Sequence, residues 1–201
     1  NQAFFALVYM WYKDKDILNL IKKGNIAYEL CRPQDIYSMW TSKILGERIS
    51  NLTLRCFPVL LFASCLPNAF RLDLSISPER FLIFLVTLVL SAFLMVFLIL
   101  LYHIICLFTL DEKGIVNIFM VVTDILSGLV IPFFPEFLQN ISNVLPFRYI
   151  SDFPFRLYVG NISIQEGLIG IIVQIIWIVI ILLLGRLLMK IALKKTVVQG
   201  G

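Results

Sequence analysis

The chain has 201 residues, of which 60% are apolar and 15% charged, and its formal net charge is +4. Soluble proteins contain roughly 45–50% apolar and about 25% charged residues. A soluble chain of this length has no interior large enough to bury that excess of apolar surface. The same numbers exclude a disordered chain, a collagen-like repeat and a disulfide scaffold. The composition is therefore that of an integral membrane protein.

Cysteine spacing and charge pattern argue against metal or nucleic acid as ligands. None of the four cysteines lies in a CxxC pair, and most of them lie in or beside apolar runs, where cysteine acts as a small apolar residue. We expect free thiols and no bound metal. No basic block with interleaved aromatic residues indicates a nucleic-acid partner. The cysteines are Cys31, Cys56, Cys65 and Cys106.

The chain opens with an apolar stretch, residues 3–11, that is too short to cross a bilayer and carries no signal-cleavage pattern. We therefore expect residues 1–12 to be the end of a truncated membrane-spanning helix. The next long polar segment, residues 13–48, contains most of the basic residues of the N-terminal half. Positive-inside logic places this segment in the cytoplasm.

Two helices are expected within residues 13–48. The first carries apolar residues at 17–21 and is capped by Asp14 or Asp16, and Pro33 separates it from the second. Asp35 caps the second helix, which presents one apolar face and should lie on the membrane surface before the chain turns inward. Two roles stay open at this point: a connector attracted to anionic lipid, or a docking surface for a cytoplasmic partner. The face of the second helix comprises Ile36, Met39, Trp40 and Ile44.

Four full membrane spans are expected, at residues 49–70, 81–110, 115–134 and 165–189. The run 81–110 is uncharged and longer than the roughly 30 Å core requires. The uninterrupted apolar part of 49–70 is short, so the distribution of basic residues along the chain decides whether this segment spans. The C-terminal tail is also basic, so an even number of crossings must separate it from residues 13–48. Ser163 and Glu166 form a capping box where the last span begins.

The segment 135–162 is expected to hold short outer helices that do not cross the membrane. Pro135 and Glu136 are typical of a helix start, and Pro146 ends that helix after about eleven residues. Such a helix is re-entrant or interfacial. Aromatic and charged residues follow it, which suits either a simple aromatic belt or the lining of a cavity.

The candidate chemistry inside the membrane is limited to His103 and Asp124. They lie at similar depths on consecutive helices, so a contact between them is possible, and an intramembrane carboxylate is a functional candidate. The simpler interpretation is a polar contact that fixes helix packing. A membrane-embedded enzyme acting on a lipid-linked substrate through these two residues, or a passive channel or scaffold, are the alternatives. No phosphate-binding loop, HExxH or GxSxG motif is present.

Two stretches resemble the permease subunits of type-two ABC exporters, in the small six-span bacterial branch. SGLVIPFFPEFL (127–138), continued by LPFRY (145–149), is similar to the family's fifth-helix and outer-loop signature. GNIAYELCRP (24–33) resembles its cytoplasmic segment after the second helix. The signature positions are Ser127, Gly128, Pro132, Pro135 and Pro146.

The resemblance implies an all-α polytopic permease that is not itself an enzyme and holds no cofactor. It implies pairing with a second, identical or paralogous permease and with a cytoplasmic ATPase dimer that binds ATP and Mg²⁺. It also implies location in the bacterial cytoplasmic membrane with a cytoplasmic C-terminus, and no nucleic-acid partner. In such proteins the segment after the second helix docks on the ATPase, which favours the docking role here. The matching positions are Gly24, Asn25, Glu29, Arg32 and Pro33.

Overall fold

The computed structural model describes residues 14–22, 26, 29, 33–64, 77–109, 112–126 and 136–195. Over these ranges every regular element is an α-helix, which confirms the predicted all-α class. The elements, in chain order, are α2 (Lys15–Lys22), α4 (Ile36–Ser64), α5 (Pro78–Thr109), α6 (Glu112–Leu126), α7 (Glu136–Val144), α8 (Asp152–Val159) and α9 (Ile164–Lys195).

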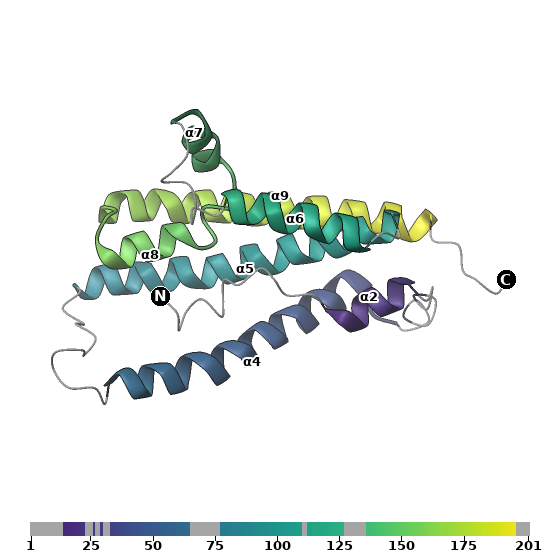
Figure 1. Cartoon of the computed structure of the whole chain (residues 1–201), viewed down its shortest axis with the longest axis horizontal. Helices are drawn as coiled ribbons and strands as arrows, with labels where there is room; N and C mark the ends of the chain where they lie inside the picture. The colour runs from purple at the N-terminus through teal and green to yellow at the C-terminus, as the bar shows by residue number, and fades with distance from the viewer. Residues whose placement is uncertain are drawn as a thin grey trace.

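Helix α5 lies at the centre of the helical bundle. It lies along α9 for most of its length and also contacts α2, α4, α6 and α8 (Figure 1). In its most apolar 18-residue stretch, 61% of the residues are buried, against 22% for α9. Helices α5 and α9 begin at the same end of the bundle, beside α8 (Figure 1).

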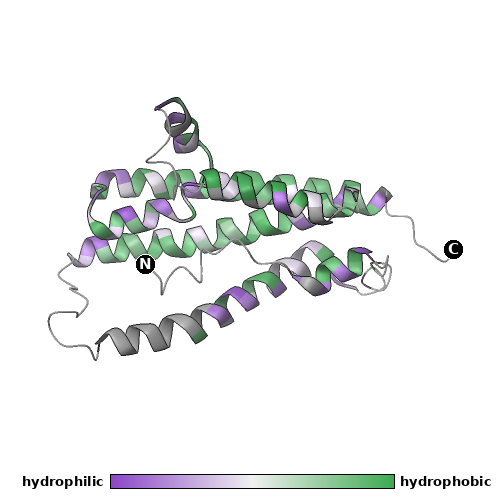
Figure 2. Ribbon diagram, viewed as in Figure 1, coloured by the Kyte–Doolittle hydropathy of each residue, from purple (hydrophilic) through white to green (hydrophobic). Residues whose placement is uncertain are grey.

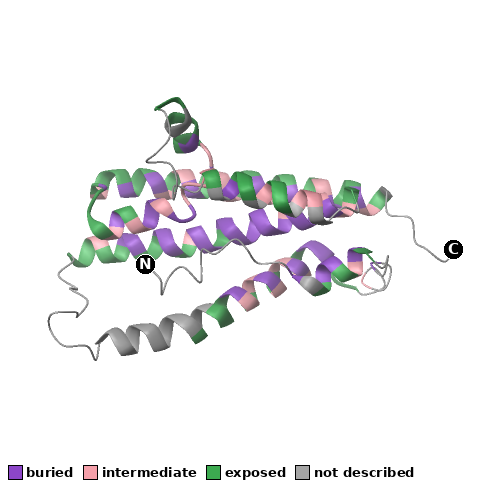
Figure 3. Ribbon diagram, in the orientation of Figure 1, coloured by how far each residue is buried: buried purple, intermediate pink, exposed green. Residues whose placement is uncertain are grey.

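Helices α5 and α9 coincide with the runs expected to span at 81–110 and 165–189. Among the described helices, these two are long and apolar enough to cross a bilayer. Much of the surface of α9 is both apolar and exposed (Figures 2 and 3). Exposed apolar surface on this scale is unfavourable in water and is typical of a helix inside a membrane. The chain is thus an all-α membrane protein.

The other two expected spans are described in part. The run 115–134 corresponds to α6, which is described as far as Leu126, and the run 49–70 corresponds to the second half of α4, described as far as Ser64. The boundary expected between residues 48 and 49 falls inside α4, which is one continuous helix of 29 residues. A single exposed glycine there, Gly46, costs only about 1 kcal/mol and does not end the helix.

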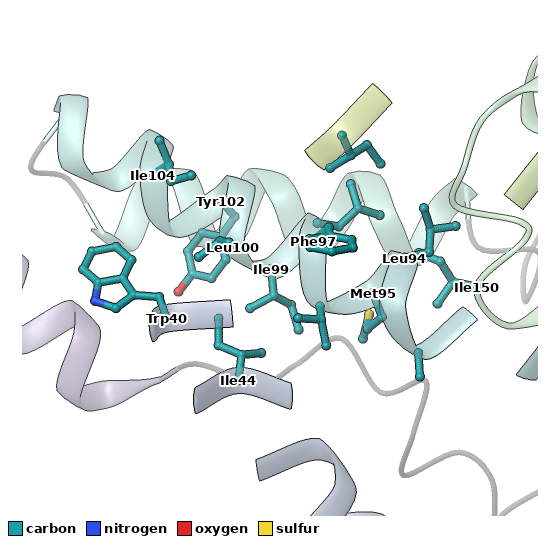
Figure 4. Packing of buried hydrophobic residues seen from close by; sticks show 14 of the residues in the cluster. Trp40, Ile44, Leu94, Met95, Phe97, Ile99, Leu100, Tyr102, Ile104 and Ile150 are labelled. Carbon is teal, nitrogen blue, oxygen red and sulfur yellow. The ribbon is translucent and has the colours of Figure 1, made fainter. Parts of the chain in front are cut away.

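The first part of α4 is held against α5 by apolar contacts. Trp40 and Ile44 are fully buried and lie beside Ile99, Leu100 and Tyr102 of α5 (Figure 4). The apolar face predicted from the spacing of residues 36–44 is confirmed, because each of its members is buried or half-buried.

The short helices between α6 and α9 begin and end as local sequence dictates. Helix α7 begins at Glu136, beside the expected start, and the chain turns at Pro146, which is buried. Helix α8 ends at Gly160, whose φ of 93° is left-handed and whose N–H donates to the Arg156 and Leu157 carbonyls. The capping box of α9 is confirmed: the Ser163 N–H donates to Glu166 at 2.8 Å, and the Glu166 N–H donates to Ser163 at 3.2 Å.

Candidate functional site

The segment predicted to couple the chain to a partner begins with a capped helix. Asp14 accepts hydrogen bonds from the N–H groups of Asp16 at 2.8 Å and Ile17 at 3.0 Å, so it is the capping residue of α2. Its carboxylate is 2% exposed. The Lys43 ammonium lies 2.9 Å from it and 2.9 Å from the Asp16 carboxylate. These ion pairs join α2 to α4.

The charges of this cluster shift the protonation of Lys43. Burial alone would lower the pKa of the Lys43 ammonium, but hydrogen bonds to Asp16 and Asp14 outweigh it and raise the pKa above its usual value of 10.5. Lys43 therefore stays charged throughout the physiological range. This neutralises Asp14, whose buried carboxylate would otherwise be costly.

Helix α4 has a cap of its own and a contact with α9. Asp35 accepts hydrogen bonds from the Ser38 hydroxyl at 2.7 Å and the Ser38 N–H at 3.1 Å, and these hold its pKa below 3.8. The Arg186 guanidinium lies 5.7 Å from the Tyr37 ring centroid. Gly185 allows this approach, because a Cβ there would lie 3.0 Å from the ring. Residues 33–48 and the C-terminal part of α9 therefore share one end of the bundle.

The predicted coupling residues are described only in part. Glu29 is half-buried and Pro33 is exposed, whereas Gly24, Asn25 and Arg32 lie outside the described residues. The docking role of this segment stays a prediction. What the structure adds is a physical route inward: Ile17, Leu18 and Ile21 of α2 are buried, and α2 contacts α5.

Of the two polar residues that could meet inside the membrane, His103 and Asp124, the structure describes the side chain of His103. The His103 side chain is fully buried, and its Nδ1 lies 2.7 Å from the Ile99 carbonyl oxygen one turn earlier. The side chain of Asp124 lies outside the described residues. The hydrogen bond of His103 to Ile99 lies within its own helix, and its contact with Asp124 and any functional role stay predictions.

The outer signature is described at one of its five positions. Ser127, Gly128, Pro132 and Pro135 lie outside the described residues, while Pro146 is buried in the turn before α8. Sequence reasoning missed the cluster that holds this turn. Gln174 of α9 donates from Nε2 to the Tyr149 carbonyl at 2.9 Å, to Ser91 Oγ at 3.0 Å and to the Thr87 carbonyl at 3.2 Å. Ser91 Oγ also lies 2.9 Å from the Tyr149 carbonyl.

Further polar contacts bind the segment between α7 and α8. The Trp177 indole donates to the Val144 carbonyl at 2.9 Å, and Tyr149 Oη donates to the Asn143 carbonyl at 3.2 Å. Asp152 pairs with Arg148 at 3.0 Å and with Arg156 at 3.5 Å. The sequence signal for these contacts was the presence of single glutamine, serine and tryptophan residues in apolar runs, because a polar side chain in a span usually forms a hydrogen bond with another part of the protein.

Metal binding finds no support in the described part of the chain, where no three His, Cys, Asp or Glu side chains gather. The Cys106 side chain is buried in the core, which agrees with its expected role as a small apolar residue. The side chains of the other three cysteines lie outside the described residues.

Comparison with known families gives one match that covers almost the whole chain. The model of the ABC-2 family transporter proteins matches residues 3–200. Neither the curated proteins nor the solved structures give a match. The match agrees with the all-helical fold and the apolar spans. It extends the resemblance, first seen in two short motifs, over almost the whole chain. The chain belongs to the ABC-2 family of transporter proteins, whose members are the membrane components of ABC transporters.

Proposed function

We propose that this chain is the permease subunit of an ATP-driven exporter, which forms a translocation pathway with a second permease and is coupled to a separate ATPase dimer. The observation that carries the proposal is the family match over residues 3–200. The ATP and Mg²⁺ that drive export would bind to the partner ATPase and not to this chain. We place the complex in the bacterial cytoplasmic membrane, with the C-terminus in the cytoplasm.

The position of α2 supports the coupling part of the proposal. Helix α2 lies at the same end of the bundle as the C-terminal part of α9, and both adjoining sequences are basic. Basic segments at one end favour the cytoplasmic side, where an ATPase is found. Force applied to α2 would reach α4 through Lys43 and the central helix α5 through buried apolar contacts.

The energetic requirement of such a machine is a difference in nucleotide affinity between two states of the complex. Closure of the ATPase dimer on ATP would displace the segment 13–35, and the spans would follow. The short helix α8 lies at the opposite end, where a substrate would leave in this scheme, and α7 projects from the side of the bundle (Figure 1).

Co-purification of the tagged chain with an ABC ATPase encoded beside it tests the pairing. Glu29→Ala is expected to uncouple ATPase stimulation from export without abolishing assembly. Glu79→Ala is the matched control, because Glu79 is exposed and lies at the start of α5, at the other end of the bundle. Normal ATPase stimulation and normal export in Glu29→Ala would refute the docking role, and failure to recover any ATPase would refute the pairing.

A further inference from the structure

A pocket of about 240 Å³ opens where the turn before α8 meets the first turns of α9. Its walls include Phe153, Ile169 and Gly170, and its charged groups are Arg148 and Glu166. The wall at Gly170 is closed tightly by Phe153, since a Cβ at Gly170 would lie 1.9 Å from the ring. One cation, one anion and an apolar wall thus share a single small cavity.

Arg148 has donors to spare. Its Nε donates to Asp152 at 3.0 Å, and in the part of the chain that the structure describes this is its one acceptor. A guanidinium carries five N–H donors in a planar fork. The four on the terminal nitrogens suit a tetrahedral anion with two accessible oxygens, such as a phosphodiester. The side chain is only 20% exposed, which strengthens any charge pairing there.

Glu166 supplies the opposite charge. Its Oε2 accepts hydrogen bonds from the Ser163 N–H and from the Ser163 hydroxyl. Among the described residues Oε1 makes no hydrogen bond. A carboxylate with one oxygen unengaged can accept from a ligand ammonium group without giving up the helix cap.

The apolar side of the pocket continues along α9. Ile169, Ile172 and Ile176 follow at helical spacing on one face, and they are 61%, 58% and 51% exposed. In a membrane protein this exposed stripe faces hydrocarbon. A ligand whose polar end lies in the pocket would thus have its apolar end directed along the helix into the bilayer.

We propose that this pocket binds the headgroup of a zwitterionic phospholipid bearing an ammonium group. The phosphodiester lies on Arg148, the ammonium group meets Glu166, and the start of one acyl chain lies along Ile169. The inference requires only that the chain is embedded in a membrane and does not depend on the transport activity proposed above.

The test is the thermal stability of the full chain in dodecyl maltoside, titrated with soluble dihexanoyl-phosphatidylethanolamine. The lipid should raise the Tm of the wild type, and Arg148→Gln should weaken the apparent affinity about tenfold or more. Arg156→Gln is the matched control, because Arg156 also contacts Asp152 but does not line the pocket. Its affinity should match that of the wild type. Equal weakening in both variants would overturn the proposal.

A second pair of variants protects the test against misfolding of Arg148→Gln. Ile169→Trp should fill the pocket and abolish the lipid-dependent shift, whereas Ile172→Trp, one turn along the same exposed face, should retain it. Retention of the shift in Ile169→Trp would contradict the site.

Three further ligands separate the sources of the phosphate. Glycerophosphoethanolamine and inorganic phosphate, which lack acyl chains, should bind at least about tenfold more weakly than the lipid. Dihexanoyl-phosphatidylglycerol, which lacks the ammonium group, should also bind more weakly. Equal binding of inorganic phosphate would make this a free-anion site, and equal binding of phosphatidylglycerol would remove the role of Glu166. Either result overturns the proposal, as does absence of any shift.

Discussion

The side-chain amide of Gln174 on α9, which is fully buried, donates to the main-chain carbonyl of Tyr149 at 2.9 Å. The same carbonyl lies 2.9 Å from Ser91 Oγ of α5. One oxygen of the irregular segment between α7 and α8 thus lies within hydrogen-bond distance of side chains from two long helices, and the Ser91 hydroxyl also lies 2.7 Å from the Thr87 carbonyl of its own helix. Irregular backbone is tolerated at membrane depth only where protein or water satisfies it, and these two side chains do so.

A double-mutant cycle measures this arrangement. Ser91→Ala and Gln174→Leu should each lower the free energy of unfolding by about 1 kcal/mol, because each leaves the Tyr149 carbonyl with the other donor. The double variant should lose more than the sum of the two, since the buried carbonyl then has neither donor and bears its full desolvation cost. Unfolding in mixed micelles followed by tryptophan fluorescence gives the three values.

The control for this cycle is Gln165→Leu, an exposed glutamine in the first turn of the same helix. Its effect should stay within about 0.5 kcal/mol. Strictly additive effects of Ser91→Ala and Gln174→Leu would show that the shared carbonyl does not couple α5 and α9.

Two glycines give opposite expectations for the same substitution. Gly170→Ala should destabilise the chain by about 1–3 kcal/mol, because its Cβ would overlap the Phe153 ring and force α8 away from α9. Gly46→Ala should stabilise it by up to about 1 kcal/mol, because nothing lies within 4 Å and alanine is the better helix former. Thermal denaturation in detergent compares the two. Equal signs would mean that the packing of α8 on α9 is not as described.

The features that sequence predicted correctly depend on local chemistry. The cap of α2, which the sequence left between Asp14 and Asp16, the cap of α4 by Asp35 and the box between Ser163 and Glu166 each need only a few consecutive residues. Spacing along the chain is therefore sufficient to predict that they exist. The long uncharged runs likewise identify α5 and α9 without tertiary information.

The features that sequence did not predict depend on which faces meet. Gln174 and Ser91 are 83 positions apart, and nothing in either neighbourhood names the other as a partner. A contact between His103 and Asp124 stays a prediction, because their matching depths do not give the rotation of either helix and the Asp124 side chain lies outside the described residues. The described hydrogen bond of His103 is to Ile99 of its own helix. The length of α4 also depends on tertiary packing, because the first part of this 29-residue helix is held against α5.

The ion pairs of Lys43 lead to a prediction about α2. Lys43→Met should leave the buried Asp14 carboxylate without its cation and cost about 1–3 kcal/mol. Because the loss is local to the α2–α4 contact, trypsin should cleave after Lys22 faster than in the wild type. Lys190→Met, at an exposed position of α9, should leave that cleavage rate unchanged.

A compensating change distinguishes charge from packing in the α2–α4 contact. Asp14→Asn added to Lys43→Met should restore much of the protection, since asparagine still caps a helix but carries no buried charge. If cleavage after Lys22 is unchanged in Lys43→Met, or if Asp14→Asn worsens it, the ion pair does not hold α2 in place.

The cap of α4 gives a pH dependence whose sign is fixed. The Ser38 hydrogen bonds lower the pKa of Asp35 below 3.8, so the ionised carboxylate stabilises the folded state. That stabilisation is fully present above pH 3.8 and is lost as the pH falls through the lower pKa of the folded state. Asp35→Asn still caps the helix but cannot titrate, so the Tm difference between wild type and Asp35→Asn should be largest above pH 5 and shrink below pH 3.8. Ser38→Ala removes the donor hydroxyl and should reduce the same acid-dependent difference, which ties the effect to this cap and not to the other carboxylates. A Tm difference that stays constant from pH 6 to pH 3 would mean that the Asp35 charge contributes nothing to the start of α4.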